Sequence, residues 1–126
     1  MITQVGTVGV NVRDQAAARA FYTEQLGFAL IRDEAMMPGT EWPRWIEVAP
    51  AGAPTHLVLF TPPDQESQIG TASRIVFHCD DIQATVQDLR ARGIRFTTEL
   101  EQQPWGWWAE FADLDGNGFG LWAPPH

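Results

Sequence analysis

The sequence predicts an α+β domain built from two copies of one strand–helix–three-strand unit. Three observations predict this fold: a strand-to-helix segment occurs twice, a pair of later strands occurs twice in the same order, and one polar connector separates the copies. A chain of 126 residues, of which 44% are hydrophobic, is long enough for one core and too short for two ordinary domains. We therefore expect one domain over residues 1–126, with module one at about 1–63, a linker at about 64–72 and module two at about 73–126.

Each half begins with a strand that runs into a helix. Residues 7–14 (TVGVNVRD) and 74–81 (RIVFHCDD) alternate apolar and other side chains and end at an aspartate, which is typical of a helix N-cap. Apolar residues at helical spacing follow each aspartate, and Gly27 and Gly93 end the two predicted helices.

Three further strands complete each half. One strand begins directly after each glycine, at residues 28–31 and 94–97. The next two strands are repeated as well: RWIEVA resembles WWAEFA, and LVLFTPP resembles FGLWAPP. Turns rich in Pro, Gly, Asp and Asn, at residues 50–54 and 113–118, connect these strands. Each half therefore has the order β-α-β-β-β.

Composition excludes several classes of function. The net charge of −8 argues against nucleic acid, whose phosphates need a basic face, and is compatible with a cationic ligand. All eight basic residues are arginine, so lysine Schiff-base chemistry is excluded. Cys79 is the only cysteine, so there is no internal disulfide. With no apolar run near the roughly 20 residues of a membrane span and no signal-like start, we expect a cytoplasmic protein.

The motifs of the repeat carry a resemblance to a known family. Asp14 with FY at 21–22 and LGF at 26–28, and FADLDGNGF at 111–119, resemble the vicinal oxygen chelate superfamily. This family includes glyoxalase I, the bleomycin resistance proteins and the extradiol dioxygenases. The resemblance implies that the strands of each half curve into a trough of mixed sheet, that two troughs face one another, and that helices cover the outside. It also implies a homodimer, often with strands or halves exchanged.

The resemblance further implies four metal-ligand positions, usually histidine in the first and fifth strands and glutamate in the fourth and eighth. In this chain they fall on Thr7, Arg74, Val58 and Gly120. Such a set offers one weak oxygen donor and one permanent cation, so we expect no inherited metal site and no cofactor. A divalent metal held anew by His56, His78 and a glutamate is the alternative to ordinary hydrogen-bonded histidines.

Strand alternation predicts which side chains line the trough. The apolar parity should face the helices, and the other parity supplies the candidate ligand-binding residues: Asn11, Trp45, His56, Phe60, Arg74, His78, Trp108 and Trp122. Of the six tryptophans, Trp42 or Trp105 is expected to serve packing or an interface instead.

The charged groups of the trough leave alternatives open. The fork of Arg74 suits a carboxylate, phosphate or enolate-like oxygen, but it equally suits an internal ion pair with Glu47 or Glu110. Those two glutamates are also candidate general bases, provided that the protein raises a pKa toward neutrality.

Three functions are compatible with the sequence. The leading hypothesis is a metal-independent binding protein of the bleomycin-resistance type that encloses an aromatic or charged small molecule in a tryptophan-lined cavity. The second is a lyase, isomerase or dioxygenase of the same superfamily that uses a metal or the Glu/Arg groups. The third is a non-catalytic structural or partner-binding module.

Overall fold

The computed structural model describes residues 1–125, and the predicted C-terminal residue of module two, His126, lies outside the described residues. Its elements, in chain order, are β1 (Thr7–Asn11), α1 (Gln15–Ala20), the π-helical turn η1 (Phe21–Gln25), β2 (Ala29–Ala35), β3 (Arg44–Ala49), β4 (His56–Phe60), the short 3-10 turn η2 (Glu66–Gln68), β5 (Ile75–His78), α2 (Ile82–Ala91), β6 (Arg95–Gln103), β7 (Gly106–Ala112) and β8 (Gly118–Ala123). No helix among these is long and apolar enough to cross a membrane.

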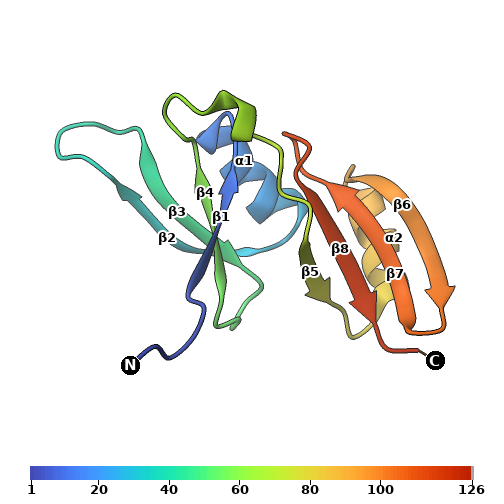
Figure 1. Cartoon of the computed structure of the whole chain (residues 1–126). Coiled ribbons are helices and arrows are strands. Elements are labelled where there is room, and N and C mark those ends of the chain that lie inside the picture. Colours follow the sequence, from blue (N-terminus) through green and yellow to red (C-terminus); the bar gives the residue numbers. More distant parts are fainter. Residues whose placement is uncertain (126) are drawn as a thin grey trace.

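Two four-stranded sheets with the same topology confirm the predicted α+β fold and its duplication. The strand orders are β1-β4-β3-β2 and β5-β8-β7-β6. In each sheet the first and last strands of the module are parallel, and the other pairs are antiparallel. The sheets lie side by side, with α2 behind the second sheet and α1 and η1 between the two (Figure 1). We call β1–β4 with α1 module one, and β5–β8 with α2 module two.

Both helices begin where the sequence predicts. The side chain of Asp14 accepts a hydrogen bond from the backbone N–H of Ala17, and Asp81 does the same for Ala84. After each helix the chain turns at a glycine with positive φ, Gly27 at 81° and Gly93 at 87°.

The helix of module one changes its hydrogen-bond pattern in its second half, which the sequence did not indicate. From Phe21 the backbone widens into a π turn, in which Leu26 N–H donates to the carbonyl of Phe21 at 2.9 Å. Two residues further along the chain, Phe28 N–H donates to the carbonyl of Tyr22 at 2.9 Å. Apolar periodicity does not distinguish four-residue from five-residue hydrogen bonds over so short a segment, so the sequence could not indicate this turn.

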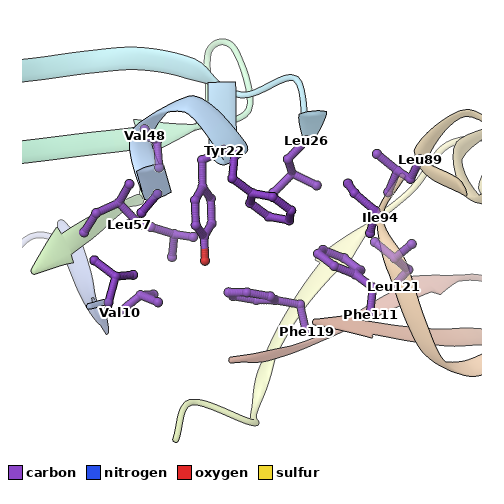
Figure 2. Close-up of a cluster of buried hydrophobic side chains, with 14 of the residues drawn as sticks. Val10, Tyr22, Leu26, Val48, Leu57, Leu89, Ile94, Phe111, Phe119 and Leu121 are labelled. Atoms are coloured by element: carbon purple, nitrogen blue, oxygen red, sulfur yellow. The ribbon is translucent and has the colours of Figure 1, made fainter. Parts of the chain in front are cut away.

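The apolar parity of the strands forms a core that is continuous between the modules. Its fully or nearly fully buried strand residues are Val10, Ile46, Val48, Leu57, Leu59, Phe111, Phe119 and Leu121, as predicted. Tyr22 and Leu26 stand between Val10, Val48 and Leu57 on one side and Phe111, Phe119 and Leu121 on the other (Figure 2). The rings of Tyr22 and Phe119 meet edge to face at 6.2 Å.

A buried polar network joins the modules beside this core. Tyr22 Oη donates to Asp113 Oδ2 at 2.6 Å, and burial beside that carboxylate raises the pKa of Tyr22. Asn117, which is fully buried, donates to the carbonyl of Asn11 at 3.0 Å and accepts from the N–H of Ala72 at 3.0 Å. The turn at residues 113–118 therefore connects β1, η1 and the linker as well as closing a hairpin.

Candidate ligand-binding faces

The strand register assigns side chains to the sheet face opposite the core. Residues that pair across neighbouring strands form a row and project on the same side. On the module-one face the rows are Thr7–His56, Gly9–Val58–Glu47–Arg32 and Asn11–Phe60–Trp45–Glu34. On the module-two face Arg74, which directly precedes β5, lies beside Gly118 in the first row. The next two rows are Val76–Gly120–Glu110–Thr98 and His78–Trp122–Trp108–Glu101.

Glu47 lies at the centre of a bonded cluster on the module-one face. Its carboxylate, 5% exposed, accepts from Trp45 Nε1 at 2.6 Å and lies 2.8 Å from His56 Nδ1. Arg32 approaches the same group at 3.7 Å. The hydrogen bonds from Trp45 and His56, with the charge of Arg32, hold the pKa of Glu47 below its usual range.

This environment affects two of the sequence-based alternatives. A general base at neutral pH needs a raised pKa, whereas the pKa of Glu47 moves in the opposite direction. The second ring nitrogen of His56 lies 3.1 Å from the carbonyl oxygen of Ala53, so both of its nitrogens are engaged inside the protein. His56 is thus a hydrogen-bonded histidine in this chain, the simpler of the two alternatives.

A hollow lies next to this cluster. It has a volume of about 250 Å³ and is lined by Thr7, Gly9, Asn11, Trp45, Val58 and Phe60, all from the predicted trough parity. A side-chain atom added at Gly9 would meet nothing within 4 Å, so the floor along β1 is open. The predicted residues Asn11, Trp45 and Phe60 therefore share one concavity.

The module-two face repeats the tryptophan–glutamate pair with different neighbours. Trp108 Nε1 donates to Glu110 Oε2 at 3.1 Å, just as Trp45 donates to Glu47. The hydroxyl of Thr98 donates to the same oxygen at 3.3 Å. Glu110 is half-buried and forms no ion pair within residues 1–125.

Aromatic side chains dominate the rest of the module-two face. The rings of His78 and Trp122 lie 4.9 Å apart, and those of Trp105 and Trp108 meet at 5.7 Å. Trp122 Nε1 donates to the backbone carbonyl of Trp105 at 3.3 Å, which holds the indole in place. Trp105 is 54% exposed and Val76 is 43% exposed. Exposed apolar side chains beside a tryptophan cluster make this face a candidate binding surface.

Arg74 does not form the internal ion pair that the sequence allowed. It is exposed, it lies just before β5, and no salt bridge or side-chain hydrogen bond involves it within the part of the chain that the structure describes. Glu47 is occupied by Trp45 and His56 instead. The guanidinium of Arg74 is therefore available to solvent on the module-two face.

The four metal-ligand positions of the family do not fit a metal ion here. Val58 is buried and aliphatic, and Thr7 and Arg74 are exposed. A side chain at Gly120 would overlap the six-membered ring of Trp108, which covers that glycine. Within residues 1–125 no group of three or more His, Cys, Asp or Glu side chains is arranged to hold a metal.

Sequence reasoning missed Arg32, Glu34 and Thr98, which belong to these faces. Pairing irregularities between Leu30 and Arg32 and after Phe96 shift the alternation of β2 and β6, so simple parity did not assign their side chains. Their place in the chain could have revealed them. They lie in β2 and β6, which pair with β3 and β7, the strands that carry the tryptophan–glutamate pairs.

Trp42 lies away from both faces. It is one of the two tryptophans, Trp42 or Trp105, that we expected to serve packing or an interface. The guanidinium groups of Arg19 and Arg44 lie 5.5 and 5.9 Å from its ring centre. Asp33 pairs with both arginines, at 2.6 and 2.5 Å, and these charges hold the pKa of Asp33 below its usual range despite the opposing effect of burial.

Comparisons with known proteins agree with the fold. Residues 4–121 match the family model described as Glyoxalase/Bleomycin resistance protein/Dioxygenase superfamily. YetH of Bacillus subtilis (strain 168), an uncharacterized protein, is 40% identical over 119 residues, which cover 94% of this chain and 97% of YetH.

Two solved structures are also similar. TnmS3, an antibiotic binding protein from Streptomyces sp. CB03234, is 38% identical, with a TM-score of 0.84 over 98% of this chain and 97% of TnmS3. A superfamily member from Sphaerobacter thermophilus DSM 20745 is 33% identical, with a TM-score of 0.85 over 97% of this chain and 98% of that protein. The chain belongs to the glyoxalase/bleomycin resistance protein/dioxygenase superfamily.

Proposed function

We propose that this protein binds a planar aromatic small molecule on its tryptophan-bearing faces, without a metal ion and without converting it. The observation that carries the proposal is the duplicated pair in which Trp45 donates to Glu47 and Trp108 donates to Glu110. Each hydrogen bond fixes an indole on an otherwise accessible face. A ring that is already held in place loses little conformational entropy when a ligand stacks on it.

The donor chemistry of the faces supports binding without a metal. The positions where metal-dependent relatives place their ligands offer one hydroxyl, one guanidinium, one aliphatic side chain and one glycine covered by an indole. A guanidinium repels a divalent cation, and a glycine cannot coordinate one through a side chain.

Binding is favoured over catalysis by the state of Glu47. Its lowered pKa leaves it ionised and saturated with donors, which makes it a support for Trp45 and His56 rather than a proton acceptor. The similar protein TnmS3 is an antibiotic binding protein, which adds weight to small-molecule binding in this chain.

A homodimer is part of the proposal. Within one chain the module-two face leaves Trp105 and Val76 about half exposed, so one copy alone does not enclose a ligand there. A second copy that covers these faces would bury the aromatic surface and close the cavity.

Equilibrium dialysis against a panel of planar aromatic compounds, before and after treatment with EDTA, tests the binding function. We expect at least one compound to bind and EDTA to leave its affinity unchanged. Trp122→Ala should weaken binding at least about tenfold, because stacking on one ring is worth one to a few kcal/mol. Trp42→Ala, which removes a tryptophan from the other side of module one, is the matched control.

Three results would count against this proposal. Absence of binding across the panel contradicts the binding function, and an affinity that is lost with EDTA and restored by a divalent metal contradicts metal independence. Sedimentation equilibrium that gives a monomer at micromolar concentration contradicts the homodimer.

A further inference from the structure

We infer that Glu110 makes the module-two face selective for cations: a positively charged group on the ligand pairs with the Glu110 carboxylate while its aromatic ring stacks on Trp108 and Trp122. This inference rests on the proposed function, because it assigns a ligand class to one of the proposed faces. It concerns charge selection, which the fold and the presence of tryptophan do not themselves determine.

The first step is the contrast between two equivalent carboxylates. Glu47 has partners within the chain: it bonds His56 at 2.8 Å and lies 3.7 Å from the permanent charge of Arg32. The strand register places Gly118 and Thr98 at the module-two positions that correspond to His56 and Arg32. Neither carries a charge or a ring nitrogen, so Glu110 lacks the partners that Glu47 has in His56 and Arg32.

The second step is the bonding of Glu110 itself. Both of its donors, Trp108 Nε1 and the Thr98 hydroxyl, bond the same oxygen, Oε2, at 3.1 and 3.3 Å. Oε1 has no donor within residues 1–125 and is not buried. A carboxylate held by one oxygen, with the other directed to an accessible face, is a pre-positioned acceptor for a ligand N–H or ammonium group.

The third step is the surroundings of that oxygen. The indole of Trp108 covers Gly120, and Trp122 and His78 continue the same surface. The faces of aromatic rings attract cations, and a partly desolvated pair of carboxylate and aromatic ring attracts them more strongly. Glu101 lies opposite Trp108 in the register, and the whole chain carries a net charge of −8. These charges raise the local concentration of a cation.

Two arginines lie close to this face without neutralising Glu110. Arg74 and Arg95 belong to the neighbouring row, next to Gly118 and opposite Ala112, and both are exposed. Neither forms an ion pair with Glu110 in the described part of the chain. Their positive charges disfavour a ligand cation at that side of the face. The ligand cation should therefore lie near the row of His78, Trp122 and Trp108.

The test uses three planar tricyclic probes of similar size: proflavine, a cation; acridone, which is uncharged; and anthraquinone-2-sulfonate, an anion. Affinities are measured by equilibrium dialysis with the full chain and with two variants. Glu110→Gln keeps an acceptor oxygen for Trp108 and Thr98 while removing the charge. Glu66→Gln removes the same charge from the exposed turn η2 and is the matched control.

We expect proflavine to bind at least about tenfold more tightly than the sulfonate, and Glu110→Gln to weaken proflavine about tenfold, the effect of losing one charge-assisted hydrogen bond. Acridone affinity should change by less than about twofold in that variant, and Glu66→Gln should change none of the three. Raising the salt concentration should weaken proflavine binding to the unaltered chain more than acridone binding, a measurement that needs no variant.

The outcomes separate this inference from the proposed function. If the probes bind but Glu110→Gln leaves proflavine unaffected, or the sulfonate binds as tightly as proflavine, the inference is overturned and the binding function stands. If none of the three probes binds, the proposed function fails and the inference fails with it.

Discussion

The two modules share one strand order and one tryptophan–glutamate pair, yet they use the glutamate differently. In module one, Glu47 is buried and bonded to His56, with Arg32 nearby. In module two, Glu110 is half-buried and bonded only to uncharged donors. The difference arises from two neighbouring positions and not from the backbone. A duplicated framework can therefore stabilise itself with one copy of a motif and present the other copy to a ligand.

The turns that precede β4 and β8 differ in a similar way. In module one the turn ends at Thr55, whose hydroxyl makes one exposed hydrogen bond, to the carbonyl of Val5 at 2.7 Å. In module two the corresponding position is Asn117, which is fully buried and bonds to Asn11, Asp113 and Ala72. The side chain of Asn117 in the second turn therefore joins the modules by hydrogen bonds, whereas that of Thr55 bonds within module one.

The largest expected effect tests this contrast between the turns. Asn117→Ala removes three side-chain hydrogen bonds, one buried and two partly buried, and leaves the carbonyl of Asn11 without that donor. We expect the free energy of unfolding to fall by about 3 kcal/mol, whereas Thr55→Ala should cost about 1 kcal/mol or less. Urea unfolding of both variants measures the difference. Equal losses would show that the two turns are equivalent.

The next effect compares the two glutamates. Glu47→Ala removes a carboxylate that is itself buried, leaves the partly buried donors of Trp45 and His56 without their acceptor, and should cost about 2–3 kcal/mol of unfolding free energy. Glu110→Ala disrupts two longer, partly exposed hydrogen bonds and should cost about 1 kcal/mol or less. Thermal and urea unfolding would check the order, and a larger loss in the Glu110 variant would reverse our assignment of roles.

A smaller effect concerns the floor beneath Trp108. Gly120→Ala places a methyl group where the indole ring lies, so the ring must move or the strand must shift. We expect a stability loss of about 1–2 kcal/mol, together with a change in tryptophan fluorescence. Val58 occupies the corresponding position of module one, and there it lines the same hollow as Trp45. An unaltered spectrum in Gly120→Ala would mean that Trp108 does not cover the glycine.

The smallest effect is the pH dependence of module one. The pKa of Glu47 is lower in the folded chain than its ordinary value of 4.5, so this group stabilises the fold above that pH. Its contribution declines as the pH falls below 4.5 and is lost below the folded pKa. The stability gap between the unaltered chain and Glu47→Gln, measured in urea, should therefore be largest near neutral pH and narrow toward pH 3. A gap that widens in acid would contradict the lowered pKa.

Much of the fold was predictable because its signals are local and duplicated. Asp14 and Asp81 cap helices as expected, and the apolar parity of the strands forms the core. The π turn after Ala20 was not predictable, because apolar spacing over five residues does not distinguish α-helical from π-helical hydrogen bonds. The homodimer and the cytoplasmic location stay predictions. The identity of the ligand lies beyond the sequence.

The candidate faces were predictable in part. Parity placed Trp45, Glu47, Trp108 and Glu110 on their sheets, since the period of two is a property of the extended backbone. Parity gave no information about Arg32 or Thr98, because bulges shift the alternation of their strands. It also left open whether Arg74 pairs with a glutamate, because partners far apart in the sequence are chosen by packing.

The sequence by itself determined the repeated unit, its helix caps and the residue types of each face, since these follow from backbone periodicity and local hydrogen bonding. Only the tertiary structure decided which carboxylate has a histidine and an arginine beside it. That choice depends on which side chains from neighbouring strands come within about 4 Å of Glu47 and of Glu110, a distance over which Coulomb and hydrogen-bond energies change steeply. Two modules with the same motif therefore differ in charge on the face that a ligand would meet.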